Sequence, residues 1–213
     1  MARLINSSDF VDLHLKISLK DPESHASLCF ITSDSSIYVV HDLRTSPFLP
    51  TKLDLPRAFQ HDDTLKLVGS CNGLLCVGSG RYLNRYFIFN PVNAGSFRIV
   101  PFAHNILSYS SYIPAHLSIV SGFGYDEKSD DYKIVYVWEN PFCPYTFNGL
   151  IYSLKSGSSW KPLNNLPNGE VTDCFGVLNN CLHFVEKNNN VVFSFDLHTE
   201  CWNEVHLPDI GKS

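Results

Sequence analysis

Apolar and polar residues alternate along most of this chain, and this period of two is typical of β-strands with one buried face. Four of the alternating runs stop at a proline that follows a leucine or a valine, at residues 53–56, 98–101, 162–167 and 205–208. The recurrence of the same ending predicts a repeated β unit.

Three of the units also share a finer pattern. Residues 151–154 precede Trp160 much as residues 193–197 precede Trp202, and residues 86–91 precede Phe97 in the same way. A self-similar unit of about 40 to 65 residues with several strands is the sequence sign of propeller blades or of a related β array. Four such units favour either the smallest closed propeller or an incomplete part of a larger one.

The strand pattern runs from residue 27 onward. The Asn72-Gly73 pair predicts a tight hairpin turn, because both positions tolerate a positive φ angle. Ahead of the strands, Ser7 or Ser8 can cap a helix that has Phe10 and Leu13 at helical spacing. The predicted fold class is therefore all-β, a partial β-propeller-like array of repeated antiparallel strand units with one short N-terminal helix. The expected strands are 27–32, 37–43, 64–70, 74–78, 122–126, 131–138, 176–178, 181–185 and 191–195.

Composition narrows the class of protein. With 213 residues and 44% hydrophobic content, the chain can bury a sizeable core. A net charge of −5, with 16 Lys and Arg spread along the chain, argues against nucleic-acid binding. No run is long and apolar enough for a membrane span, and no secretory segment is found. An odd count of 7 Cys indicates reduced thiols, so we expect a soluble cytoplasmic or nuclear protein.

The sequence offers little catalytic chemistry. It has no nucleophile elbow, phosphate-binding loop or H-E-x-x-H pair. We interpret Gly122 and Gly124 as glycines at a close strand approach, since Glu127 would repel a phosphate. Residues 126–131 are acidic but lack calcium-loop spacing, which favours a solvated turn. The gaps among the remaining candidate ligands do not fit zinc, so we expect no metal, no cofactor and no catalytic residue; those candidates are Cys71, Cys76, Cys174, Cys181 and His183.

Binding is expected on two irregular segments. The first is the long loop 103–118, and the second lies near residues 142–145. Loops on a rigid β frame often carry binding residues, and aromatic side chains on them make good anchors. The candidate target-binding residues are Tyr109, Tyr112, Pro114, Phe142 and Tyr145. The alternative is that these rings tuck under their loops as a satellite core.

Four motifs in order resemble a known family. They are residues 67–76, 89–91, 122–135 and 152–160. Their order and spacing resemble the F-box-associated region of plant F-box proteins, including the S-locus and kelch-like groups. Residues 4–15 also resemble the stretch that closes an F-box. The resemblance implies a remnant of the F-box C-terminal helix at 1–20 and an F-box-associated β-propeller-like domain at 21–213 that is truncated at its C-terminal end.

The resemblance also implies a function. Such proteins are substrate receptors of SCF-type ubiquitin ligases, in which the β region holds a target protein and the receptor performs no catalysis. Binding of a Skp-type adaptor and a cullin is expected only if an F-box is supplied upstream. Two alternatives stay open: a propeller-type hydrolase or sugar-active enzyme, which needs convergent carboxylates, and a non-functional truncated remnant with unpaired strand edges.

Overall fold

The structure of the chain is a computed structural model. It describes residues 28–40, 47, 49–55, 59, 64–79, 85–91, 97–101, 119–140, 143, 146–157, 159–187 and 191–208. Within these residues the chain forms fifteen β-strands and no α-helix, and accordingly no helix of this part is long and apolar enough to cross a membrane. The helix expected near residues 7–17 lies outside the described residues.

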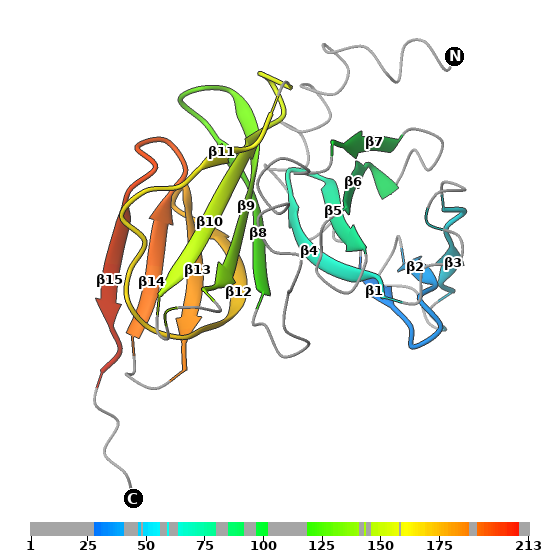
Figure 1. The fold of residues 1–213 in the computed structure, drawn as a ribbon. Coiled ribbons are helices and arrows are strands. Elements are labelled where there is room, and N and C mark those ends of the chain that lie inside the picture. The colour runs from blue at the N-terminus through cyan, green and yellow to red at the C-terminus, as the bar shows by residue number, and fades with distance from the viewer. Residues whose placement is uncertain are drawn as a thin grey trace, which may run out of the picture.

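The strands form four antiparallel sheets, and in each sheet the spatial order of the strands follows their order in the chain (Figure 1). We call the sheets blades 1 to 4. Blade 1 holds β1 (Leu28–Ile31), β2 (Ile37–Val40) and β3 (Thr51–Lys52). Blade 2 holds β4 (Lys66–Cys71), β5 (Leu74–Ser79), β6 (Arg85–Phe89) and β7 (Phe97–Val100). Blade 3 holds β8 (Ile119–Asp126), β9 (Asp131–Glu139), β10 (Phe147–Ser153) and β11 (Lys161–Pro162). Blade 4 holds β12 (Val171–Leu178), β13 (Cys181–Glu186), β14 (Val191–Asp196) and β15 (Trp202–His206).

The repeated unit of the sequence corresponds to one blade. Each of the four proline-terminated runs lies at or directly after the last strand of a blade, namely β3, β7, β11 and β15. The expected hairpin at Asn72-Gly73 is also confirmed, with φ angles of 50° and 73° between β4 and β5. The prediction of an all-β, propeller-like array is therefore confirmed.

The blades lie side by side with their first strands innermost. Strand β8 contacts β4 on one side and β12 on the other, and β4 also contacts β12. In Figure 1 blade 4 stands on the left, blade 3 beside it, and blades 2 and 1 follow to the right. Successive blades thus turn about a common axis, as in a propeller.

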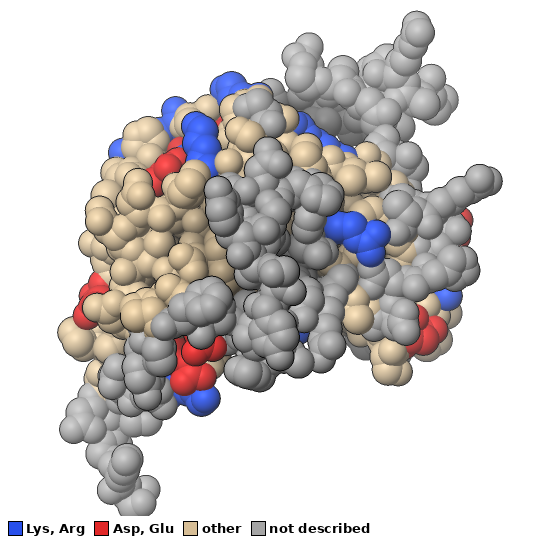
Figure 2. All heavy atoms as spheres, viewed as in Figure 1, with Lys and Arg blue, Asp and Glu red and all other residues tan. Residues whose placement is uncertain are grey.

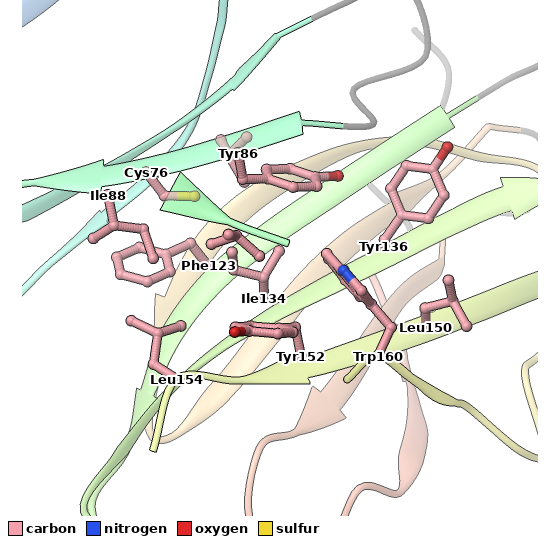
Figure 3. Close-up of a cluster of buried hydrophobic side chains, with 12 residues drawn as sticks. Cys76, Tyr86, Ile88, Phe123, Ile134, Tyr136, Leu150, Tyr152, Leu154 and Trp160 are labelled. Carbon is pink, nitrogen blue, oxygen red and sulfur yellow. The ribbon is translucent and has the colours of Figure 1, made fainter. Parts of the chain in front are cut away.

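The hydrophobic core lies between blades. One cluster joins blades 1 and 2, a second joins blades 2 and 3, and a third joins blades 3 and 4. The second cluster is rich in aromatic rings, with Tyr86 of blade 2 facing Tyr136, Tyr152 and Trp160 of blade 3 (Figure 3). The faces of a blade are thus stabilised by its neighbours, which holds the strand ends in a fixed arrangement.

Two glycines of β8 make the contact between blades 3 and 4 possible. A Cβ on Gly122 would lie 2.8 Å from Cys174 Sγ, and a Cβ on Gly124 would lie 2.5 Å from Val177 Cγ2. Both distances are shorter than real Cβ contacts. The interpretation of these residues as glycines at a close strand approach is therefore confirmed.

Candidate functional site

The five residues that we expect to contact a target, Tyr109, Tyr112, Pro114, Phe142 and Tyr145, lie outside the described residues. Their role stays a prediction. The structure does describe the strand ends from which both segments leave, so the base of the candidate site can be built from these ends.

Both segments are attached to the same end of blade 3. The long segment joins the first residue of β8, Ile119, and this residue lies opposite Trp138 of β9. One residue later β9 ends at Glu139, which lies opposite Phe147, the first residue of β10. The loop 103–118 and the segment around residues 142–145 therefore share neighbouring attachment points.

The entry to the long segment is held by a tryptophan of the next blade. Trp160 Nε1 donates a hydrogen bond of 2.8 Å to the carbonyl oxygen of Pro101, directly after β7. The ring itself is 8% exposed and packs against Tyr86, Tyr136 and Tyr152. This tryptophan therefore belongs to the core, and its polar atom also ties the end of blade 2 to blade 3.

The second segment has a closed base. Asn140 N donates to Thr146 O at 2.8 Å, and Cys143 N donates to Asn140 O at 3.3 Å. Thr146 Oγ1 in turn donates to Cys143 O at 2.7 Å. Because these bonds restrain the ends of the segment, the segment would lose less conformational entropy if a partner bound there.

Acidic side chains surround this end of blades 3 and 4. Lys187 Nζ lies 2.7 Å from Glu170 Oε1, and this hydrogen bond, with a smaller contribution from Glu139, raises the pKa of Lys187. Glu186 is 5% exposed and accepts a hydrogen bond of 3.2 Å from Glu170 N. Two carboxylates, those of Glu170 and Glu139, thus act on Lys187 at this end of the blades.

The opposite end of the same two blades carries a buried polar network. Lys133 Nζ lies 3.2 Å from Asp126 Oδ2 and 3.3 Å from Glu200 Oε1, and it also donates to the carbonyl oxygen of Leu197. His198 Nδ1 lies 3.3 Å from the same Asp126 oxygen. The three ammonium protons of the lysine have three acceptors, so the network fixes the β8–β9 hairpin to the β14–β15 turn.

Sequence reasoning missed this network. We expected a solvated turn at residues 126–131, whereas the side chain of Asp126 is fully buried and that of Lys133 is 8% exposed. One feature of the sequence could have indicated the network. Lys133 lies on the same face of its strand as Val135 and Val137, and a lysine on an apolar face needs a buried anion as its partner. The partners of Lys133 in blade 4, Glu200 and the carbonyl oxygen of Leu197, had no comparable local signal.

Four described carboxyl groups have shifted pKa values, and the direction of these shifts does not fit a general acid. Burial alone would raise the pKa of Asp126, but hydrogen bonds from Ser129 and Lys133 outweigh it and hold the pKa well below its ordinary value. The pKa values of Asp34, Asp130 and Asp196 are also lowered. A general acid needs a raised pKa instead.

Thiols and metal ligands give no further site in this part of the chain. Burial raises the pKa values of Cys29 and Cys174 to about 11, so these thiols are protonated at neutral pH. The described residues contain no group of three His, Cys, Asp or Glu side chains placed to hold a metal ion. On the face shown in Figure 2, the acidic and basic residues that the structure describes lie in small groups among uncharged ones.

The chain is similar to two F-box proteins of Arabidopsis thaliana. It is 26% identical to F-box protein At3g07870 over 171 residues, which cover 68% of this chain and 39% of that protein. It is 25% identical to F-box protein CPR1 over 231 aligned positions, which cover 97% of this chain and 53% of that protein. The chain therefore spans about half or less of the length of these relatives.

Solved structures with a similar fold are less similar in sequence than these two relatives. A streptogramin B lyase has a TM-score of 0.41 at 13% identity, covering 89% of this chain and 57% of that one. The extracellular domain of a one-component system, BT4673 from B. thetaiotaomicron, has a TM-score of 0.43 at 13% identity, covering 84% and 21%. These scores are too low to carry an argument about function.

The model of the F-box associated beta propeller domain matches residues 28–212. This range includes every described strand, from β1 to β15, and it agrees with the resemblance found in the four motifs. The chain belongs to the family of F-box associated β-propeller domains.

Proposed function

We propose that this chain is a target-recognition module that binds another protein and performs no catalysis. In an SCF-type ubiquitin ligase, such a module holds a target near the conjugating enzyme, so that its contribution is positioning. Binding to a Skp-type adaptor and a cullin requires an F-box joined upstream. We place the module in the cytoplasm or the nucleus, where such a ligase would act.

The observation that carries this proposal is the pairing of Ile119 with Trp138. It attaches two aromatic-rich segments to one end of blade 3, and the inter-blade cores fix that end. A rigid frame with adjoining loops suits protein recognition, because little order has to be created on binding. The family of the chain supports the same assignment.

The described carboxyl groups favour this proposal over a hydrolase or sugar-active enzyme. A glycosidase needs one carboxylic acid that stays protonated near neutral pH. Asp126 and Glu200 both lie close to Lys133, and hydrogen bonds from Ser129 and Lys133 hold the pKa of Asp126 below its ordinary value, which favours the ionised form of that carboxyl group. Three continuous core clusters also argue against a non-functional remnant with an unpacked interior.

The test is affinity capture followed by site-directed crosslinking. The chain is used to capture proteins from its native tissue, and the main captured protein is purified. A photo-reactive amino acid then replaces Tyr112 or Tyr145, with Lys128 as the matched control position on the β8–β9 turn at the opposite end of blade 3. We expect crosslinks from the first two positions and none from the control.

Alanine variants test the same surface in solution. Tyr112→Ala and Tyr145→Ala are expected to weaken target binding by roughly fivefold or more each, since aromatic anchors at an interface typically contribute over about 1 kcal/mol. Lys128→Ala is expected to leave it unchanged. Equal crosslinking from all positions, or unchanged binding in both tyrosine variants, would refute this placement of the site.

A further inference from the structure

The chain contains three Asn-Gly pairs, and the structure describes all of them: Asn72-Gly73, Asn148-Gly149 and Asn168-Gly169. Glycine has no Cβ to shield its backbone nitrogen from the side chain of the preceding asparagine. The nitrogen can therefore attack the side-chain amide carbon, and asparagine is among the thermolabile residues of proteins. The attack requires the backbone between the two residues to rotate, so the fold decides which pair can react.

The pair Asn148-Gly149 is held inside a sheet. It lies within β10 and is paired with β9 on one side. On the other side, Gly149 O accepts a hydrogen bond of 2.8 Å from Leu163 N. Rotation of this backbone would break the pairing of a central strand of blade 3.

The pair Asn72-Gly73 is held by a hairpin. It forms the turn between β4 and β5, and the strand residues on either side of it, Cys71 and Leu74, are paired with each other. Its φ angles of 50° and 73° are those of a tight turn. Rotation of this backbone would open the end of the hairpin.

The pair Asn168-Gly169 lies outside every described sheet. It belongs to residues 163–170, the linker between β11 and β12 (Figure 1). Asn168 is exposed, and in the part of the chain that the structure describes neither residue of the pair takes part in a hydrogen bond. The backbone of this pair can therefore rotate without breaking a strand pairing.

The linker is anchored on both sides of the pair. Before it, Leu163 N donates to Gly149 O at 2.8 Å. After it, Lys187 N donates to Glu170 O at 2.9 Å, and Glu170 N donates to Glu186 Oε1 at 3.2 Å. The freedom to rotate is thus confined to the residues around Asn168, while the rest of the linker stays attached to blades 3 and 4.

We propose that Asn168 is a site of spontaneous deamidation. Gly169 N attacks Asn168 Cγ and forms a C–N bond, and the side-chain nitrogen leaves as ammonia with the proton of the Gly169 amide. Water then opens the succinimide ring. Cleavage of the new C–N bond gives aspartate, whereas cleavage of the original peptide bond gives isoaspartate, in which the main chain continues through the side-chain carbon.

The isoaspartyl product does not fit the described packing of the linker. Gly169 has a φ of 151°, and a Cβ on it would lie 3.0 Å from Glu186 Cγ and 3.2 Å from Phe193 Cε2. Isoaspartate lengthens the main chain at this close approach and adds a negative charge two residues before Glu170. Deamidation is therefore expected to weaken the attachment of the linker to blade 4.

The experiment ages the whole folded chain at mildly alkaline pH, which promotes loss of the amide proton, and maps its peptides by mass spectrometry. We expect the mass gain of an amide-to-acid exchange at Asn168 well before Asn72 and Asn148, with isoaspartate among the products. In guanidinium chloride, where the sheets are lost, the three pairs are expected to react at similar rates. If Asn72 or Asn148 reacts as fast as Asn168 in the folded chain, or if Asn168 reacts only in guanidinium chloride, the proposal is overturned.

Two variants separate the effect on stability from other changes during ageing. Asn168→Gln keeps an amide at this position, but its longer side chain would have to close a larger ring, which forms more slowly. We expect ageing to lower the urea midpoint of the wild-type chain and to leave that of Asn168→Gln unchanged. Freshly purified Asn168→Asp adds the charge without lengthening the main chain, so its midpoint should fall less than that of the aged wild-type chain.

Circular dichroism confirms that each variant is folded before ageing. An aged wild-type chain in which Asn168 is converted but the urea midpoint is unchanged would overturn the expected weakening of the linker. An equal fall of the midpoint in aged Asn168→Gln would do the same, because the fall would then come from another site.

Discussion

The buried polar network that joins blades 3 and 4 predicts that replacing Lys133 lowers the free energy of unfolding by a large amount. Lys133 Nζ and Asp126 Oδ2 are 3.2 Å apart and almost fully buried. At an effective dielectric constant of about 20, two unit charges at this distance attract by about 5 kcal/mol, although burial of the ions offsets part of this. Lys133→Met removes the positive partner and leaves a buried carboxylate, which is expected to lower the free energy of unfolding by about 3 to 5 kcal/mol.

A matched control lies in the same blade. Lys155 Nζ is 3.6 Å from Asp130 Oδ2, with the side chains 59% and 77% exposed. Lys155→Met is therefore expected to cost less than about 1 kcal/mol, as for other exposed ion pairs. Urea denaturation followed by circular dichroism measures both variants. If Lys133→Met lowers the free energy of unfolding no more than Lys155→Met does, the buried pair does not stabilise the chain and the reasoning is refuted.

The same pair predicts the dependence of stability on pH. The pKa of Asp126 is lower in the folded state than its ordinary value. A lowered folded pKa means that the contribution to stability is complete above the unfolded pKa, about 3.9 for aspartate. It is lost as the pH falls toward the folded pKa. Stability of the wild-type chain should therefore fall on acidification below about pH 5, and it should fall less in Lys133→Met. An identical acid dependence in both proteins would contradict this assignment.

Two further predictions concern close contacts between blades. Gly122→Ala places a methyl group 2.8 Å from Cys174 Sγ and should lower the free energy of unfolding by about 1 to 3 kcal/mol, measured by urea denaturation. Gly69→Ala is the control, because the nearest atom to its new methyl group is 3.4 Å away, and it should lower the free energy of unfolding by less. Equal losses in the two variants would contradict the close approach at Gly122. Trp160→Phe removes the hydrogen bond to the Pro101 carbonyl and should cost about 1 kcal/mol. No measurable loss of stability in Trp160→Phe would contradict a stabilising role of this hydrogen bond.

The local part of the fold could be read from the sequence. The proline-terminated runs marked the repeated β unit, and Asn72-Gly73 marked a hairpin, because turn chemistry and alternation depend on neighbouring residues. The pairing of Ile119 with Trp138 was not predicted, because the expected strand began at residue 122 whereas β8 begins at Ile119. A four-residue turn between Asp126 and Asp131 sets the register of the two strands over their whole length.

Contacts between blades could not be read in this way. Lys133 and Leu197 are 64 residues apart in the chain, and their contact depends on how two blades pack rather than on either local pattern. The candidate binding residues are a related case. Aromatic content and loop position singled out Tyr112 and Tyr145, but which rings face a partner depends on tertiary packing that alternation does not encode.

The placement of the core clusters between blades has a consequence for how the chain folds. Each cluster is completed by two successive sheets, so a single sheet on its own would leave half of a cluster in water. Stability then accumulates through nearest-neighbour contacts, as in other repeat proteins. A cut between Leu166 and Val171 would strip the partner from Val120, Val135 and Ile151, so the smallest piece able to fold is a pair of adjoining sheets.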